Sequence, residues 1–176
     1  MPISSLRRVT ALIAVTPVVL RTELTALGDE GAGFHPAPGE WCAREVIGHL
    51  IEADRRGFAG RIEQMLAADR PALEPWDQPA VAAARGDCDR PNAEVLDEFA
   101  ATRSDGLALL DRLAEADLDR VGVHPQIGEM TVRDVVWEWP FHDRDHLKQV
   151  LANTRALLWP DLGSARRFTE QRGGEI

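Results

Sequence analysis

Two histidines, His142 and His146, lie four positions apart in the segment W-E-W-P-F-H-D-R-D-H-L-K-Q, residues 137–149. On a helix, residues four apart lie one turn above each other on the same face. The apolar periodicity of the segment predicts that its inward positions are Val132, Val135, Trp139, His142, His146, Gln149 or Val150, and Asn153. Both histidines therefore occupy positions that core side chains would otherwise fill.

A third histidine, His49, lies on the inward stripe of an earlier helical segment, with Cys42, Val46, Ala53, Gly57 and Gly60. The small residues that follow it allow either a close helix approach or a cavity. Three imidazoles from two helices can hold one divalent ion and leave a coordination position open. Such an ion could lower the pKa of water to about 7 or deprotonate a thiol. The alternative is a metal-free, hydrogen-bonded core cluster.

Five further side chains are candidates for the surroundings of this site. Glu45 lies one turn before the second-helix histidine, while Asp143 and Asp145 flank the fourth-helix pair. These carboxylates either orient the imidazoles or solvate the helix surface. His124 is either structural or at the mouth of the site, and Trp76 is a loop anchor or a pocket wall. H-D-R-D-H also resembles the zinc-protease motif H-E-x-x-H, but the shorter Asp143 and the missing downstream ligand argue against proteolysis.

Four amphipathic helical segments must position these residues, and their expected ranges are 4–27, 41–68, 92–116 and 131–158. Thr16-Pro17 predicts a kink or restart in the first segment. Thr131 and Asp134 predict a capping box at the start of the fourth. Residues 69–91 are rich in proline and form a long irregular stretch, which indicates either a functional rim or a short extra helix at 80–84.

No segment of the chain predicts a strand. The expected fold is therefore all-α: a single domain over residues 1–176, built as a four-helix bundle with a long irregular loop between helices 2 and 3.

The composition excludes several classes of partner. The 176 residues carry a formal net charge of -9 without a basic cluster, which argues against nucleic acid. Cys42 and Cys88 are far apart and have no C-x-x-C spacing, which predicts neither a disulfide nor a thiolate metal site and suits a reducing cytoplasm. No run approaches the roughly 20 apolar residues of a membrane span, and no convincing signal cleavage site follows the N-terminal apolar stretch. We expect a cytoplasmic protein without membrane contact.

Segments in order along nearly the whole chain resemble the DinB-like (DinB/YfiT) superfamily. They are W-C-A-R-E-V-I-G-H-L at 41–50, E-P-W-D-Q at 74–78, H-P-Q-I-G-E-M-T-V-R-D-V at 124–135 and H-D-R-D-H-L-K-Q at 142–149. That family usually has Ser where this chain has Cys42. The resemblance implies a four-helix bundle, often dimeric, with a divalent metal bound by one histidine of the second helix and two of the fourth. Those positions match His49, His142 and His146.

The resemblance also implies a range of activities. Relatives include thiol-dependent transferases and isomerases that use small bacterial thiols such as bacillithiol or mycothiol. We therefore expect a homodimeric, metal-dependent enzyme, with zinc or nickel favoured, that transfers such a thiol to a small electrophilic substrate. The alternatives are a metal-dependent hydrolase and a non-catalytic bundle that binds a metal or a small ligand.

Overall fold

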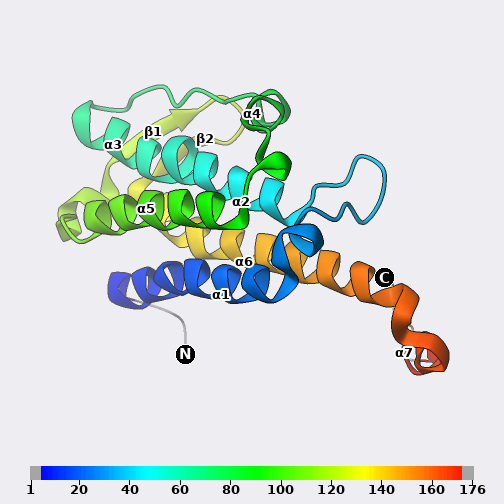
Figure 1. Cartoon of the computed structure of the whole chain (residues 1–176). Coiled ribbons are helices and arrows are strands. Elements are labelled where there is room, and N and C mark those ends of the chain that lie inside the picture. The colour runs from blue at the N-terminus through cyan, green and yellow to red at the C-terminus, as the bar shows by residue number, and fades with distance from the viewer. Residues whose placement is uncertain (1–4, 172–176) are drawn as a thin grey trace.

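The architecture consists of four long helical rods, which the computed structural model describes within residues 5–171 (Figure 1). The rods are α1 (Leu6–Ala32); α2 (Ala43–Glu52), continued by the π-helical segment η1 (Ala53–Phe58) and α3 (Ala59–Ala67); α5 (Asn92–Leu110); and α6 (Val132–Leu158). Both α1 and α2 pack against α5 and α6. The expected all-α, four-helix bundle is confirmed.

Helix α1 continues through Pro17, so the expected interruption at Thr16-Pro17 is wrong. Proline lacks the N–H that would bond to the carbonyl four residues earlier. That carbonyl, of Ile13, accepts a hydrogen bond from Arg103 Nη1 at 2.8 Å instead. A side chain from another helix thus compensates for the missing backbone bond. The expected start at Ser4 lies outside the described residues, and the helical region extends past Leu27 to Ala32, with a non-helical Gly28 inside it.

By length and composition alone, α1 is long and apolar enough to cross a membrane, since one 18-residue window has a mean hydropathy of 1.4. The sequence analysis did not anticipate this. The helix nevertheless packs as part of the bundle, because Val9, Ile13, Leu20 and Leu24 are buried against the other rods. Several valines on its other face remain exposed and raise the hydropathy.

The second rod runs over residues 43–67, close to the expected range 41–68, but it is not one regular α-helix. Glu45 Oε2 accepts a hydrogen bond from the backbone N–H of Cys42 at 2.8 Å, which fixes the start of α2. Residues Ala53–Phe58 then adopt the wider π-helical turn, in which Asp54 and Phe58 are both buried. π-helical turns inside α-helices occur frequently at functional sites.

The long segment between the second and third rods contains α4 (Gln78–Arg85), which confirms the expected short helix near 80–84. Asp77 caps it by accepting a hydrogen bond from Ala80 N at 3.0 Å. A short 3-10 turn, η2 (Asp87–Asp89), follows and lies against α2. Arg85 connects these elements to the second rod by donating to Glu52 at 2.9 Å.

Two short strands lie between α5 and α6, so the expectation of no strand is wrong. Strands β1 (Val121–His124) and β2 (Gly128–Thr131) form an antiparallel hairpin in which Val121 pairs with Thr131. The backbone of Val123 also bonds to Pro71 O and Leu73 N, so the hairpin holds the start of the long segment.

The third rod ends correspondingly early, at Leu110 instead of the expected Ala116. Thr131 and Asp134 form the expected capping box at the start of α6, with Asp134 N donating to Thr131 Oγ1 at 3.1 Å.

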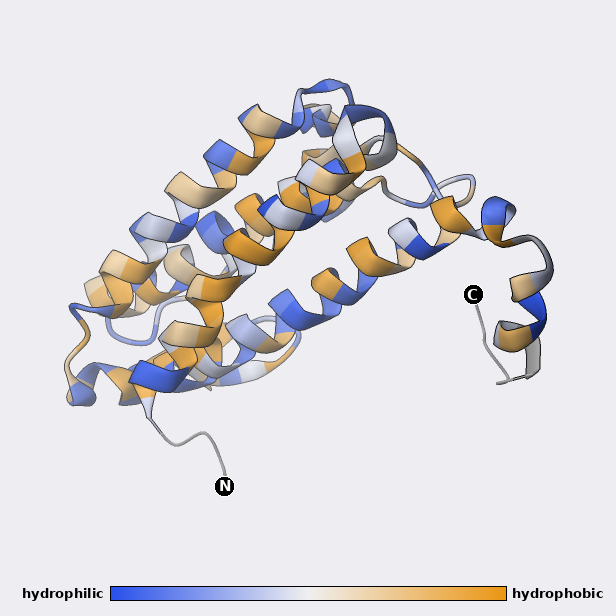
Figure 2. Cartoon of the chain, turned by 60° about the horizontal axis from the view of Figure 1, so that its bottom comes forward, coloured by the Kyte–Doolittle hydropathy of each residue, from blue (hydrophilic) through white to orange (hydrophobic). Residues whose placement is uncertain are grey.

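Two apolar clusters fill the bundle, and a polar layer separates them. On α1, Ile13 belongs to one cluster and Leu20 to the other, while Thr16 lies between them. On α6, Trp139 and Val150 belong to different clusters, and the two histidines lie in the interval between them. Figure 2 shows this alternation of apolar and polar residues along the rods. The candidate functional residues therefore lie at mid-height in the bundle.

Candidate metal site and buried polar layer

His49 from α2 and His142 and His146 from α6 converge on one point. The Nε2 atom of His142 lies 3.2 Å from Nε2 of His49 and 3.2 Å from Nε2 of His146. One ligand atom from each of the three rings lies within 4.8 Å of the other two. The periodicity of two separate segments therefore identified three side chains that meet in space.

These separations fit a common ion. Two imidazole nitrogens about 2.05 Å from a tetrahedral ion are about 3.3 Å apart. Hydrogen bonding explains the contacts less well, because a neutral imidazole nitrogen carries either one hydrogen or one lone pair. The Nε2 atom of His142 can therefore satisfy only one of its two 3.2 Å contacts as a hydrogen bond. A cation at the point of convergence explains both contacts, because each of the three Nε2 atoms would direct its lone pair at the cation.

Burial keeps two of these imidazoles in the neutral form that binds metal. Desolvation, followed by the effects of His146 and His142, lowers the pKa of His49 to about 3. Desolvation likewise lowers the pKa of His142 to about 4, with contributions from His146 and Arg103. Near neutral pH both rings therefore carry a free lone pair.

Only His146 among the three rings has a protein partner for its second nitrogen within the described residues. Its Nδ1 lies 2.9 Å from Gln149 Oε1, and an amide oxygen accepts only, so Nδ1 carries the hydrogen and Nε2 the lone pair. The buried Nδ1 atoms of His49 and His142 have no hydrogen-bond partner in the described part of the chain. Gln149 is thus the residue that fixes a ligand tautomer, a role that the sequence analysis missed.

Aromatic rings enclose the histidines. His49 packs against Trp41, with ring centroids 5.3 Å apart, and stacks on Trp76 at 5.9 Å. On the other side, the Phe58 ring contacts His142 edge-on at 5.2 Å. The pocket-wall alternative for Trp76 therefore agrees with the structure. These rings shield the nitrogens from bulk water, which strengthens electrostatic interactions at the site.

Of the two alternatives for the carboxylates of Glu45, Asp143 and Asp145, orientation of an imidazole of this site does not occur for any of the three within the described part of the chain. Glu45 caps α2, and its carboxylate approaches His35 at 3.6 Å. Asp145 is exposed and lies 3.8 Å from Lys148. Asp143 is fully buried but points to a different partner, Arg103, at 2.6 Å. These three carboxylates are therefore committed elsewhere.

Asp143 belongs to a buried group that we call the Arg103 cluster, made of Thr16, Asp54, Arg103, Trp139 and Asp143. Arg103 donates to both carboxylates and to the Ile13 carbonyl, so all five of its N–H groups have acceptors. Trp139 Nε1 donates to Asp54 at 2.7 Å, and Thr16 Oγ1 donates to Asp143 at 2.6 Å. Removing one partner of a buried group of this kind costs about 3–5 kcal/mol.

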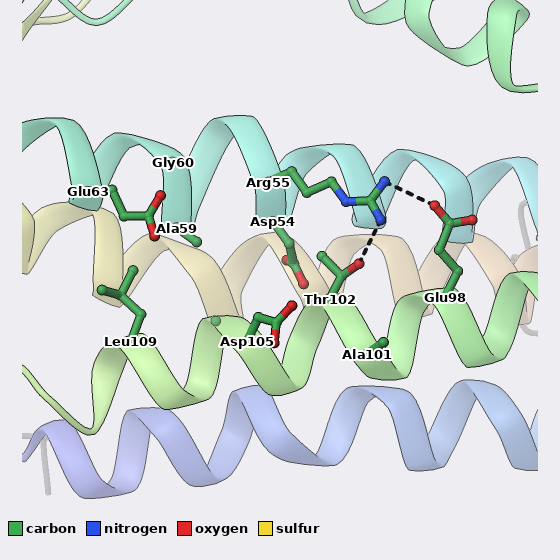
Figure 3. Close-up of a pocket in the computed structure, with 11 residues that line it drawn as sticks. Asp54, Arg55, Ala59, Gly60, Glu63, Glu98, Ala101, Thr102, Asp105 and Leu109 are labelled. Atoms are coloured by element: carbon green, nitrogen blue, oxygen red, sulfur yellow. Dashed lines mark hydrogen bonds and ion pairs between the residues drawn. The ribbon is translucent and has the colours of Figure 1, made fainter.

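The Arg103 cluster brings two carboxylates to one guanidinium. Desolvation raises the pKa of Asp54 to about 6 despite the opposing effect of Arg103, and Asp143 adds to the rise. Burial, with a smaller contribution from the second carboxylate, therefore shifts proton uptake by Asp54 into the mildly acidic range. Asp54 also borders a cavity of about 290 Å³ between the second rod and α5, where Arg55 bonds to Glu98 and Thr102 (Figure 3). The residues that line this cavity do not include the three histidines.

A separate cleft of about 400 Å³ has Trp76 in its wall, and the same Trp76 ring stacks on His49; the residues that line this cleft do not include the three histidines. Its walls also include His124, Arg61 and Gln126. His124 is buried and does not belong to the triad, since its Nδ1 accepts a hydrogen bond from Gln126 N. His124 therefore lies in the wall of this cleft, and its place at the mouth of the histidine site stays a prediction.

The fold and the site together define a class: helical-bundle proteins with a partly buried three-histidine centre contributed by two helices. The sequence pattern of the DinB superfamily matches residues 13–150, and the chain belongs to that superfamily. A provisionally named metal-dependent hydrolase of Geobacillus kaustophilus is 27% identical over 151 residues, which cover 85% of this chain and 84% of that protein. A second, from Oceanobacillus iheyensis, is 22% identical over 143 residues, with coverage of 81% and 82%.

The fold is also that of a solved structure. YfiT from Bacillus subtilis is described as a probable metal-dependent hydrolase with an unusual four-helix bundle topology. It superposes with a TM-score of 0.79 at 18% identity, covering 89% of this chain and 90% of YfiT. The expected DinB-like membership is thereby confirmed.

Proposed function

We propose that this protein is a metal-dependent hydrolase whose divalent ion is held by His49, His142 and His146. The observation that carries the proposal is the pair of 3.2 Å contacts between their Nε2 atoms, which matches the spacing of ligands around one ion. The names of the sequence relatives support hydrolysis and give no support to thiol transfer, the activity that the sequence analysis preferred. Zinc and nickel both suit a set of imidazole ligands.

Several side chains of the chain would have distinct roles in hydrolysis. When bound, a divalent ion supplies Lewis-acid chemistry, including the activation of water near neutral pH. Gln149 holds the His146 ring with its Nε2 lone pair directed at the point of convergence. Trp41, Trp76 and Phe58 limit access of bulk water to the rings. Among the described residues, no carboxylate is hydrogen-bonded to the three imidazoles, and Gln149 is the side chain that orients one of them.

The cleft suggests a small, polar substrate with an apolar part. Trp76 and Pro75 offer flat apolar surface, while Arg61 and Gln126 offer hydrogen-bond donors. The Trp76 ring lies between this cleft and His49, so a substrate in the cleft would contact the ring that stacks on one of the ligands. We expect an anionic or carbonyl oxygen of the substrate to face Arg61.

The test is a turnover screen of small esters, amides and lactones with untagged protein, with and without bacillithiol, mycothiol or glutathione. We expect hydrolysis that needs no thiol, stops on chelation and returns with zinc or nickel. His146→Ala should abolish it and should bind one molar equivalent less metal. Lys148→Ala, an exposed neighbour on the same helix, is the matched control and should retain both properties.

Two outcomes would contradict the hydrolase proposal. Turnover that requires an added thiol would instead assign transfer chemistry. A metal that raises the melting temperature of the protein without turnover on any substrate would assign a non-catalytic binding role. Full metal retention by His146→Ala would refute the ligand set itself.

A further inference from the structure

A second group of metal-binding side chains lies at the start of α2, away from the three histidines. His35, Cys42, Glu45 and Cys88 each place one potential ligand atom within 4.8 Å of the other three. They come from the loop after α1, from the cap of α2, from its first turn and from η2. The structure brings Cys42 and Cys88 to one place although they are far apart in sequence, because the long segment after α3 returns to the start of α2.

The geometry of His35 is that of a ligand. Its Nδ1 lies 2.8 Å from the backbone carbonyl of Glu40, which can only accept, so Nδ1 carries the hydrogen. Nε2 then holds the lone pair, and it faces Cys88 Sγ at 3.2 Å. Metal-binding histidines typically donate their second N–H to a carbonyl or carboxylate in this way.

The remaining ligands are held in position by the backbone. Glu45 accepts from Cys42 N with one carboxylate oxygen, which leaves the other oxygen available. Arg44 donates to the Cys88 carbonyl and to Asp29 O, and so holds η2 against the end of α1. The site is built before any ion arrives, which reduces the entropy cost of binding.

We propose that His35, Cys42, Glu45 and Cys88 form a second, structural site for a thiophilic divalent cation, of which zinc is the best match. Two thiolates, one imidazole and one carboxylate complete the four-ligand shell that is usual for structural zinc. A cation bound there would displace the thiol protons and join three segments that are distant in sequence. The side chain of His35 is 47% exposed, so the cation can enter from solvent.

The site differs from the histidine centre in ligand chemistry, which makes it separately measurable. Cobalt(II) bound to thiolates gives an intense near-ultraviolet charge-transfer band, and cobalt(II) bound to imidazoles alone does not. We therefore test the proposal on untagged His146→Ala protein, because this substitution disables the histidine centre. A phosphine reductant keeps both cysteines as free thiols. Titration with cobalt should produce the band at one molar equivalent, and zinc should then abolish it. Failure of the hydrolase proposal would leave this result unchanged.

Variants assign the ligands. Cys42→Ser and Cys88→Ser should each reduce the band, and the double variant should lose it completely; Ser is a favoured helix cap, so Cys42→Ser keeps the start of α2. His35→Ala should weaken cobalt binding. Asp89→Asn, an exposed neighbour of Cys88 in η2, is the matched control and should keep the full band.

The proposal is overturned if the reduced protein with intact cysteines gives no charge-transfer band, or if the band survives in the Cys42→Ser, Cys88→Ser double variant. It is also overturned if an oxidant converts the two thiols to a disulfide at the same rate with and without zinc. Bound zinc should instead protect both thiols from a thiol-specific reagent.

Discussion

At the scale of single residues, the three histidines differ in how firmly the protein holds them. His146 has a partner in Gln149, at 2.9 Å, whereas the second nitrogens of the other two rings have none among the described residues. The orientation of one ligand therefore depends on a single amide. Helical periodicity placed Gln149 near the inward face, but its role depends on a side-chain rotamer that periodicity does not define.

Gln149→Ala should weaken metal binding at the histidine centre by about 10- to 100-fold, the usual effect of removing a group that orients a ligand. Gln149→Glu should preserve most of the affinity, because a carboxylate also accepts the Nδ1 hydrogen. Chelator competition in a Cys88→Ser background measures this centre without the second site. Gln64→Ala, on the exposed side of α3, is the control, and equal affinities for both alanine variants would contradict the role of Gln149.

Arg103 is the residue whose loss should cost the protein most stability. Arg103→Met would leave Asp54 and Asp143 buried without their cation, and we expect a loss of about 3–5 kcal/mol in the free energy of unfolding. Urea denaturation measures the effect. Arg112→Met, at an exposed position just after α5, should change stability by less than about 0.5 kcal/mol. A similar small effect at Arg103 would show that the cluster contributes little net stability.

Asp54 should make stability depend on pH in the mildly acidic range. Its pKa is raised from 3.8 to about 6 by burial, so the folded protein binds more protons than the unfolded chain between these values. This contribution to stability is present below the unfolded pKa and is lost as pH rises through the folded pKa. Urea denaturation across this range should show wild type losing stability relative to Asp54→Asn as pH increases; a constant difference would contradict the shift.

At the scale of elements, the docking of η2 on α2 depends on the absence of a side chain at Gly48. A Cβ at this position would lie 1.8 Å from Asp87 Oδ2. Asp87 cannot easily move away, because Arg85 and Arg90 hold its carboxylate at 2.6 and 2.7 Å. The glycine therefore sets the distance between the second rod and the segment that carries Cys88.

Gly48→Ala should destabilise the protein by about 1–3 kcal/mol, the usual cost of overpacking, although alanine favours helix. Gly57→Ala is the matched control within the same rod, because nothing lies within 4 Å of its added Cβ. It should leave stability unchanged or raise it by up to about 1 kcal/mol. Thermal and urea unfolding compare the two variants, and equal effects would contradict the close approach at Gly48.

The elements also show which features the sequence could predict. The apolar periodicity of long amphipathic segments predicts where the helices lie and which faces of α2 and α6 point inward. It therefore predicted that His49 lies close to His142 and His146. The four-residue strands of the hairpin are too short for a periodic signal. Both alternatives for Asp143, support of an imidazole and solvation of the helix surface, missed its ion pair, because Arg103 comes from another helix and periodicity within one segment does not define that contact. The meeting of Cys42 with Cys88 depends on the path of an irregular segment, which local patterns do not encode.

At the scale of the whole molecule, α1 presents an apolar outer face. Val15, Val18 and Val19 are exposed there, and Val18 is 65% accessible. The same face includes a shallow hollow lined by Pro17 and Arg21. The expected homodimer remains a prediction, and this face is a candidate for its interface because contiguous exposed apolar surface marks protein contacts.

Val18→Glu should therefore convert a dimer into a monomer, since two like charges would face each other near a twofold axis. Sedimentation equilibrium measures the change. Ile127→Glu, at the tip of the hairpin where Ile127 is 64% exposed, is the control and should leave the assembly intact. A wild-type protein that sediments as a monomer would contradict the expected homodimer.

One feature of α6 limits how the protein can be redesigned. His142 and Asp143 are consecutive, yet one belongs to the histidine centre and the other to the Arg103 cluster. Rotating the helix to enlarge the coordination sphere for a different cation would pull Asp143 out of its interior ion pair. Engineering of metal selectivity should therefore begin on the second rod, around His49, and leave the register of α6 untouched.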